Sequence, residues 1–362
     1  MMIRVCLFLL LYLTGSAVAK VNVLFVNPSI PGEPFWQSVE DITRQAAVQL
    51  NVNLDVIYGG GNRLVQLERV KAYLDKSSKP DYAIVLNYPG GANALMTLLA
   101  QKEINFVTLE QTIFAEERKK IGIARQYYRT WLGEIYFDNQ TAGHQLASAL
   151  NSLKNQKLPA KASHVIAING HYGSESQARF NGMHQFFKEN KGVVYQAVHA
   201  GWSEPVAYKQ AKALLNRFPQ ANIIWAASDL MALGASKAAI ELGRKPNQDI
   251  FIGGFDWVSR AVEAVANGQL SASIGGHKIM GAWALISVAL HHQGDDIFAR
   301  QKDYKLLFDM DLITPTNVDI YLSHKQALNW RAYNFKKLKE KVAKSHSLEN
   351  LSPLDPNYPL TR

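Results

Sequence analysis

The sequence predicts an α/β protein built from two doubly wound parallel-sheet lobes. Short apolar runs alternate with amphipathic helical segments along most of the chain, a pattern typical of parallel sheets covered by helices on both faces. These β-α units are too many for one comfortable open sheet, so two similar halves fit better. The length of 362 residues is also comfortable for two hydrophobic cores.

The predicted strands are short apolar runs, each followed by a segment with helical spacing. They begin at Val21, Leu54, Tyr82, Asn105, His164, Val193, Asn222 and Asp249. Leu64, Leu67, Val70 and Leu74 form one such helical face after the second run. Helices in this reading start at polar or Gly residues and stop at Gly or Pro, as at Gly243.

The two halves carry no Pro/Gly/Ser-rich linker between them, so short crossings rather than a tether should join them. After the second half, a helix over residues 277–292 and two extended pieces near Tyr304 and Thr316 are expected. We therefore expect three crossings, near Phe137, Gly276 and Asp309. The predicted parts are an N-terminal lobe of residues 20–137 plus 277–308, a C-terminal lobe of residues 138–276 plus 309–327, and a basic C-terminal extension of residues 328–362.

The first 19 residues have the pattern of a cleavable signal peptide. Arg4 precedes an unbroken apolar run over residues 5–13, and Ala17 to Ala19 form a small-residue cleavage site. The apolar run is too short to span a bilayer. Cys6 lies too early for a lipoprotein cleavage site. The chain is therefore expected to be secreted and cleaved after Ala19.

Cleavage would change both the cysteine content and the charge. The single cysteine would be removed, which excludes disulfides and thiol chemistry from the mature chain. The formal charge would fall from +9 to +8, because Arg4 is the only charged residue removed. A secreted protein is not expected to bind nucleic acid. Part of the positive charge gathers near the C-terminus, where a solvated helix surface is a better reading than a contact with anionic lipids or an acidic partner. These residues are Arg331, Lys336, Lys337, Lys339, Lys341 and Lys344.

Aromatic and polar residues follow the predicted strands, where ligands bind in open α/β sheets. Flat aromatic faces stack on the apolar face of a pyranose, while carboxylates, amides and a guanidinium satisfy hydroxyl groups. The composition of these positions thus predicts a cleft for a small polar ligand, a sugar or a sugar-like molecule. The candidate ligand-binding residues are Phe35, Trp36, Glu110, Gln111, Asn139, Arg179, Trp202, Ser228 and Asp256.

Catalytic and metal-binding patterns are missing from the sequence. The glycines at 59–61 lack the rest of a P-loop and indicate a plain strand-to-helix turn, and no nucleophile elbow, zincin or C-x-x-C motif is present. Glu110 and Asp256 are better read as hydrogen-bond acceptors than as a glycosidase pair. Asp229 is at least as well explained as a helix N-cap as by ligand contact, and Trp225 is expected in the core. We therefore predict a binding protein that is not an enzyme, with no cofactor and no metal.

Several motifs in one order resemble the type I periplasmic binding proteins, specifically their ribose/galactose-like branch. The most specific is the strand, Ser-Asp pair and MALG helix over residues 222–244, followed by IGGFD and AVANGQLSASIG. SQARFNGMHQF from Ser176 resembles the arginine helix of the family, and YFDNQTAGHQLA resembles its passage into the second lobe. The resemblance covers about residues 21–317 and implies two lobes that close on a ligand.

The resemblance also carries expectations for single residues. Phe35 and Trp36 match the aromatic pair that sandwiches the sugar ring, and Trp202 matches an aromatic on its other side. Polar contacts are matched without change at Asn139, Arg179 and Asp256, and conservatively at Glu110. Positions that depart from ribose-like binders are Glu33 for Asn, Gln111 for Arg, Ser228 for Asn and Gly276 for Gln. The stacking frame is kept while the hydroxyl-reading set differs, so simple ribose is not the expected ligand.

The chain also resembles the autoinducer-2-binding periplasmic receptors, through Trp36, Gln111 and Arg179, although those receptors lack the aspartate found here at Asp256. This leaves two roles open. The protein either delivers its ligand to an inner-membrane ABC permease or reports to a membrane sensor kinase or cyclase. In both cases we expect the planar guanidinium group of Arg179 to donate hydrogen bonds to two ligand oxygens. We also expect the open cleft to keep this side chain hydrated.

Overall fold

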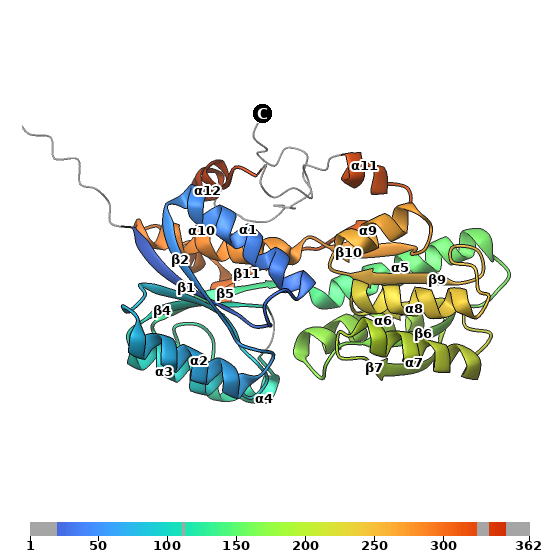
Figure 1. Cartoon of the computed structure of the whole chain (residues 1–362), viewed down its shortest axis with the longest axis horizontal. Coiled ribbons are helices and arrows are strands. Elements are labelled where there is room, and N and C mark those ends of the chain that lie inside the picture. Colours follow the sequence, from blue (N-terminus) through green and yellow to red (C-terminus); the bar gives the residue numbers. More distant parts are fainter. Residues whose placement is uncertain (1–19, 111–112, 324–332, 345–362) are drawn as a thin grey trace, which may run out of the picture.

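The computed structural model describes residues 20–110, 113–323 and 333–344, and it forms two lobes that lie side by side (Figure 1). The N-terminal lobe contains a six-stranded sheet of order β11-β5-β4-β3-β1-β2 in which all neighbours are parallel. Its strands are β1 (Val21–Asn27), β2 (Val52–Tyr58), β3 (Tyr82–Leu86), β4 (Asn105–Leu109), β5 (Trp131–Phe137) and β11 (Lys305–Phe308).

The C-terminal lobe repeats this arrangement with a sheet of order β12-β10-β9-β8-β6-β7. Its neighbours are parallel except for β12, which runs antiparallel to β10. Its strands are β6 (His164–Asn169), β7 (Val193–His199), β8 (Ile223–Ala226), β9 (Phe251–Phe255), β10 (Ala272–Gly275) and β12 (Asp311–Ile313). The predicted fold class is thus confirmed, with an antiparallel edge strand in the second lobe.

Helices cover both faces of the N-terminal sheet, because alternate side chains of its buried strands point to opposite faces. Phe25 and Ile84 join the core under α1 and α10, whereas Leu24 and Val85 join the core under α2, α3 and α4. The helices are α1 (Pro34–Leu50), α2 (Arg63–Lys76), α3 (Ala92–Gln101), α4 (Ala115–Ile121) and α10 (Met280–His292).

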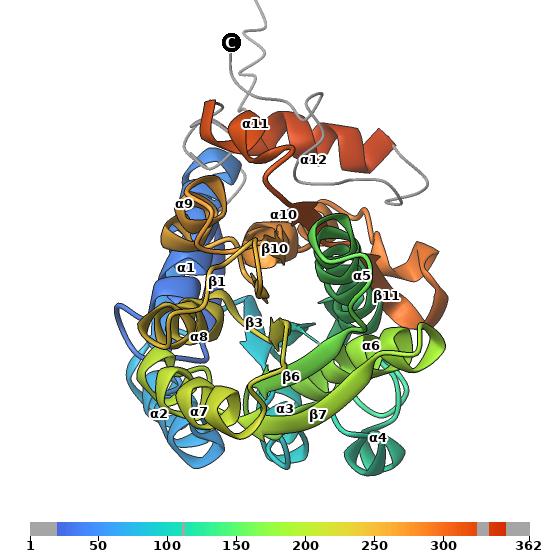
Figure 2. The same ribbon diagram turned by 90° about the vertical axis from the view of Figure 1, so that its right-hand side faces the viewer.

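In the C-terminal lobe, α5 and α6 lie on one side of the strands and α7, α8 and α9 on the other (Figure 2). Their bounds are α5 (Asn139–Lys157), α6 (Ser174–Glu189), α7 (Glu204–Arg217), α8 (Asp229–Glu241) and α9 (Ser259–Ala266). The described residues also contain 3₁₀ turns at His277–Ile279, Phe298–Arg300 and Lys302–Tyr304.

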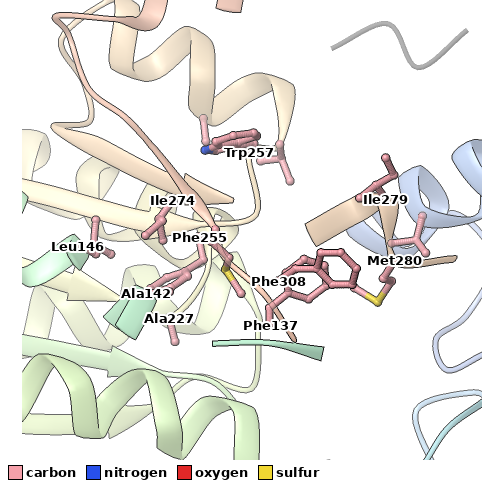
Figure 3. Packing of buried hydrophobic residues seen from close by; sticks show 14 of the residues in the cluster. Phe137, Ala142, Leu146, Ala227, Phe255, Trp257, Ile274, Ile279, Met280 and Phe308 are labelled. Carbon is pink, nitrogen blue, oxygen red and sulfur yellow. The ribbon is translucent and has the colours of Figure 1, made fainter. Parts of the chain in front are cut away.

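The chain passes between the two sheets three times, after β5, after β10 and between β11 and β12. At this boundary the rings of Phe137 and Phe308 pack with their centroids 5.8 Å apart, beside Met280 (Figure 3). The sequence prediction of a second extended piece near Thr316 was wrong in position. The strand that pairs with β10 is Asp311–Ile313, and Thr316 follows it in the turn before α11 (Val318–Ser323).

The described part of the basic C-terminal extension forms α12 (Phe335–Lys344), which packs on α1 and α10 of the N-terminal lobe. Its apolar face buries Phe335, Leu338 and Val342. The side-chain amide of Gln49 on α1 fixes the start of α12 with two hydrogen bonds. It donates to the carbonyl of Tyr333 at 2.7 Å and accepts from the backbone N–H of Phe335 at 2.7 Å. Arg331 and the predicted signal peptide lie outside the described residues. No helix in the described ranges is long and apolar enough to cross a membrane.

Candidate ligand-binding cleft

A cavity of about 560 Å³ lies between the lobes at the carboxyl ends of the parallel strands. This is where the sheet topology places ligand sites in open α/β proteins. The N-terminal lobe contributes the segments after β1, β2, β3 and β4, and the C-terminal lobe contributes those after β6, β7, β8 and β9. Both lobes therefore face the same cavity.

Most of the residues chosen from the sequence meet at this cavity. Its lining includes Phe35, Trp36, Glu110, Arg179, Trp202, Ser228 and Asp256. Asn139 lies behind the lining and contacts Arg179. Gln111 lies outside the described residues. That these side chains bind a ligand stays a prediction, but their convergence from seven separate segments is a feature of the fold.

Arg179 is the centre of the wall formed by the C-terminal lobe. Its Nε donates to Asn139 Oδ1 at 2.8 Å, and one terminal nitrogen donates to the carbonyl of Ala227 at 2.8 Å. The same nitrogen lies 3.6 Å from Asp256 Oδ1, and the guanidinium carbon lies 4.5 Å from the ring centroid of Phe255. The side chain is held in one orientation by groups of its own lobe.

This orientation depends on the close packing of α5 against α6. A Cβ at Gly143 would lie 1.9 Å from the carbonyl oxygen of Arg179, and a Cβ at Gly182 would lie 1.9 Å from the carbonyl oxygen of Gln140. Only glycines allow the two helices to approach this closely, and the approach brings Asn139 at the start of α5 to Arg179 in the second turn of α6.

The expectation that Arg179 is hydrated was wrong. The side chain is only 4% exposed. Its hydrogen bonds to Asn139 and Ala227 take the place of water, so its removal should affect the stability of the protein as well as ligand binding.

Aromatic rings face the cavity from both lobes. Phe35 and Trp36, at the start of α1, pack edge to face with centroids 5.3 Å apart. Trp202 follows β7 in a left-handed conformation with φ of 66°, and its ring lies over Gly170, where a Cβ would meet it at 2.2 Å. A flat ring between two such walls would find apolar faces on either side.

Glu33 supports the aromatic pair from the sequence position just before it. Its carboxylate caps α1 by accepting from the backbone N–H of Phe35 at 3.3 Å and of Trp36 at 2.8 Å. Burial raises the pKa of Glu33, and the two backbone hydrogen bonds oppose this shift. The Asp256 carboxylate adds a smaller upward shift.

Of the two readings of Asp229, the helix-cap reading was wrong, because Ser228 is the residue that caps α8. The Ser228 hydroxyl accepts from the backbone N–H of Met231 at 3.3 Å. Asp229 is fully buried and does not line the cavity. Its carboxylate accepts from Ser273 Oγ at 2.8 Å and from the backbone N–H of Val258 at 3.0 Å, so it joins the loop after β9 to β10.

Burial raises the pKa of Asp229 well above its usual range, with the charge of Asp256 adding to the shift. Lys278 faces these carboxylates from behind the cavity wall, and its Nζ donates to the carbonyl of Trp257 at 2.7 Å. Burial lowers the pKa of Lys278. The expectation that Trp225 is a core residue agrees with its complete burial.

The cleft residues that sequence reasoning missed include Asn87, Glu175 and His277. Asn87 follows β3 directly, so the strand-end rule that selected the other residues could have found it. His277 follows Gly276, whose φ of 107° turns the chain at the second crossing, and its Nε2 lies 3.3 Å from Asp256 Oδ1. Glu175 lies in the first turn of α6, where burial raises the pKa of its carboxyl.

Polar atoms on the side of the N-terminal lobe lack partners. Both side-chain atoms of Asn87 and Oε2 of Glu110 are buried with no hydrogen-bond partner among the described residues. Within residues 20–110, 113–323 and 333–344, no group of three or more side chains is placed to hold a metal ion. The site therefore offers hydrogen bonds, charges and aromatic faces.

A family model described as a periplasmic binding protein domain matches residues 23–296. The chain belongs to this family. The D-allose-binding periplasmic protein of Escherichia coli is 26% identical over 268 residues, which cover 73% of this chain and 82% of the relative. The ribose import binding protein of Salmonella typhimurium is 24% identical over 265 residues, covering 72% of this chain and 81% of the relative.

A solved structure of a periplasmic sugar-binding protein from Pseudomonas fluorescens is also similar. It superposes with a TM-score of 0.78 at 26% identity and covers 89% of this chain and 94% of that one. These proteins of the family are binding proteins rather than enzymes. The chain is accordingly a solute-binding protein of the periplasmic type.

Proposed function

We propose that this protein closes on a sugar or sugar-like ligand in the periplasm and delivers it to an ABC permease of the inner membrane. The observation that carries the proposal is the cavity itself. Aromatic rings face it from both lobes, and the network of Arg179, Asn139 and Asp256 forms one wall. Rings that stack on an apolar sugar face, together with paired donors and acceptors for hydroxyls, make a site for a polyhydroxylated ring.

Three features of the chain support uptake from the periplasm. Its relatives include proteins named for the import of ribose and of D-apiose. The pattern of residues 1–19 supports export and cleavage after Ala19. The proposed lobes, residues 20–137 plus 277–308 and 138–276 plus 309–327, meet at three crossings that would serve as the hinge for closure.

A thermal-shift screen of pentoses, hexoses, amino sugars and cyclic polyols against the mature protein tests the binding proposal, because a ligand that binds only the folded state raises the melting temperature. Titration calorimetry would then give the affinity of each hit. We expect at least one compound of this class to bind with a stoichiometry of one per chain. Uptake of that compound should be lost in cells that lack the protein. No binding by the whole class would overturn the sugar assignment, and unchanged uptake would overturn delivery to a permease.

A further inference from the structure

The formal charges that line the cleft are unbalanced. Four carboxylates line the cavity, those of Glu33, Glu110, Glu175 and Asp256, and Arg179 is the one lysine or arginine among the lining residues that the structure describes. The two neighbouring positions outside the described residues, 111 and 112, are Gln and Thr and carry no charge. These two residues therefore add no positive charge, and the excess of carboxylates remains when they are counted with the cavity wall.

Arg179 does not neutralise this excess, because its charge is already shared within the C-terminal lobe. It lies 3.6 Å from Asp256, which also faces His277 Nε2 at 3.3 Å. Lys278 is outside the cavity lining, and its Nζ donates to a backbone carbonyl. The carboxylates of Glu33, Glu110 and Glu175 have no ion-pair partner among the described residues within 4 Å.

Of the carboxylates in the cleft, that of Glu110 is the least well satisfied by hydrogen-bond donors of the protein. It follows β4 with φ of 60°, a conformation that non-glycine residues seldom adopt, and it is 6% exposed. Its Oε2 has no hydrogen-bond partner among the described residues. A buried carboxylate oxygen without a hydrogen-bond donor destabilises the folded protein. A donor from the ligand would remove this penalty.

Glu175 faces Glu110 from the opposite lobe. Burial is the main cause that raises the pKa of Glu175, and the negative charge of Glu110 adds to the shift, while the charge of Arg179 opposes it. Two like charges on facing walls repel when the lobes approach each other. A cation placed between them would turn this repulsion into attraction from both sides.

We propose that the ligand is an amino sugar whose protonated amine binds between Glu110 of the N-terminal lobe and Glu175 of the C-terminal lobe. This rests on the proposed function, since it assigns a charge to the sugar-like ligand of the same cleft. An ammonium group has three donors and no acceptor, which suits the unpaired Oε2 of Glu110 and the carboxylate of Glu175, which has no ion-pair partner among the described residues. The faces of Trp36 and Trp202 in the same cavity are also favourable to a cation.

The charge of the ligand would then be linked to closure. Without a cation, Glu110 and Glu175 oppose the approach of the lobes. With the amine in place, each lobe contributes one charge-assisted hydrogen bond to the same nitrogen. Neutral sugars of the same shape would leave both carboxylates buried without an ammonium partner and would bind more weakly.

The first experiment compares matched compounds. Calorimetric titrations would use D-glucosamine, D-galactosamine and D-mannosamine beside their neutral parents D-glucose, D-galactose and D-mannose and beside the N-acetylated forms. For at least one of these pairs we expect the amine to bind about tenfold or more tightly than both the parent and the acetylated form, the effect of a hydrogen bond to a charged group. The neutral parent is the control for size, because a hydroxyl group is close in size to the amine. The acetylated form keeps the nitrogen and removes its charge, but it adds bulk.

The second experiment removes one carboxylate charge and keeps the shape. Glu110→Gln should lower the affinity for the preferred amine about tenfold more than it lowers the affinity for the neutral parent. Its melting temperature without ligand should rise, because the repulsion with Glu175 is gone. Glu68→Gln, an exposed glutamate on α2, is the matched control and should change neither quantity.

The outcomes separate this inference from the proposed function. Tight binding of a neutral sugar with no gain for its amine would overturn the charge assignment and leave the sugar-binding role intact. An unchanged amine preference in Glu110→Gln would overturn the position assigned to the amine. Binding by no sugar and no amino sugar would overturn the proposed function and this inference with it.

Discussion

The two walls of the cleft differ in how they satisfy their polar groups. In the C-terminal lobe, Arg179 is hydrogen-bonded to Asn139 and Ala227 before any ligand arrives. In the N-terminal lobe, Asn87 and Glu110 bury polar atoms that have no partner among the described residues. One wall is thus preorganised by the protein, and the other depends on the ligand. Hydrogen bonds gained on ligand binding should therefore contribute most to the affinity at the N-terminal wall. The C-terminal wall should mainly fix the position of the ligand.

Removal of Arg179 is expected to have the largest effect. Arg179→Ala should reduce ligand affinity by about thirtyfold to several thousandfold, since truncation within a buried charged network costs about 2–5 kcal/mol. It should also lower the melting temperature without ligand, because Asn139 and Asp256 lose a buried partner. Titration and thermal melting of Arg69→Ala, an exposed arginine on α2, provide the control. Full stability of the ligand-free variant would show that the C-terminal wall is not preorganised by this residue.

A matched pair of asparagine variants tests the contrast itself. Asn87 and Asn139 are both fully buried; Asn87 belongs to the N-terminal wall of the cavity, and Asn139 lies behind the C-terminal wall. Asn139→Leu should destabilise the ligand-free protein by about 1–3 kcal/mol, because it leaves the buried Nε of Arg179 without its acceptor. Asn87→Leu should leave stability equal or higher and should weaken ligand binding about tenfold or more, because it removes donors and acceptors that only the ligand uses. Denaturant unfolding and calorimetry measure the two effects, and equal losses of stability in the two variants would remove the distinction between the walls.

Helix packing gives a smaller expected effect. Gly143→Ala should separate α5 from α6, because its Cβ would lie 1.9 Å from the carbonyl oxygen of Arg179. Overpacking of this kind costs about 1–3 kcal/mol, and the shift of Asn139 relative to Arg179 should weaken ligand binding. Ala142→Gly at the neighbouring position is a useful comparison, since it perturbs the same helix without adding an atom at the interface. Wild-type stability in Gly143→Ala would contradict the packing explanation.

The smallest expected effect is a change in how the melting temperature depends on pH. The pKa of Glu175 is raised, so the folded protein holds this proton more tightly than the unfolded chain does. Its contribution to the free energy of unfolding therefore falls as pH rises toward the folded-state pKa. Glu175→Gln should melt above wild type at about pH 7.5, and the difference should shrink toward about pH 5.

Glu263→Gln, an exposed glutamate on α9, should follow wild type at both pH values. A difference between Glu175→Gln and wild type that stays constant with pH would contradict the raised pKa of Glu175.

The same contrast explains how far sequence reasoning reached. Strand and helix periodicity predicted both sheets, and the strand-end rule brought Arg179, Trp202 and Asp256 to one cavity, because these positions follow from topology. The burial of Arg179 could not be predicted, since it depends on the close contact of α5 and α6 at Gly143. The position of His277 depends on the backbone turn at Gly276, and the like-charge relation of Glu110 and Glu175 exists only when two lobes face each other.

Hydrogen–deuterium exchange with the sugar or amino sugar found in the screen is the most direct test of a ligand held between both walls. The account predicts that ligand slows exchange in peptides from both lobes, around Phe35, Asn87 and Glu110 on one side and around Trp202, Ser228 and Asp256 on the other. The N-terminal segments should gain the larger protection, because their polar groups acquire partners only with ligand. Protection confined to one lobe, or to a surface away from the cleft, would contradict the account.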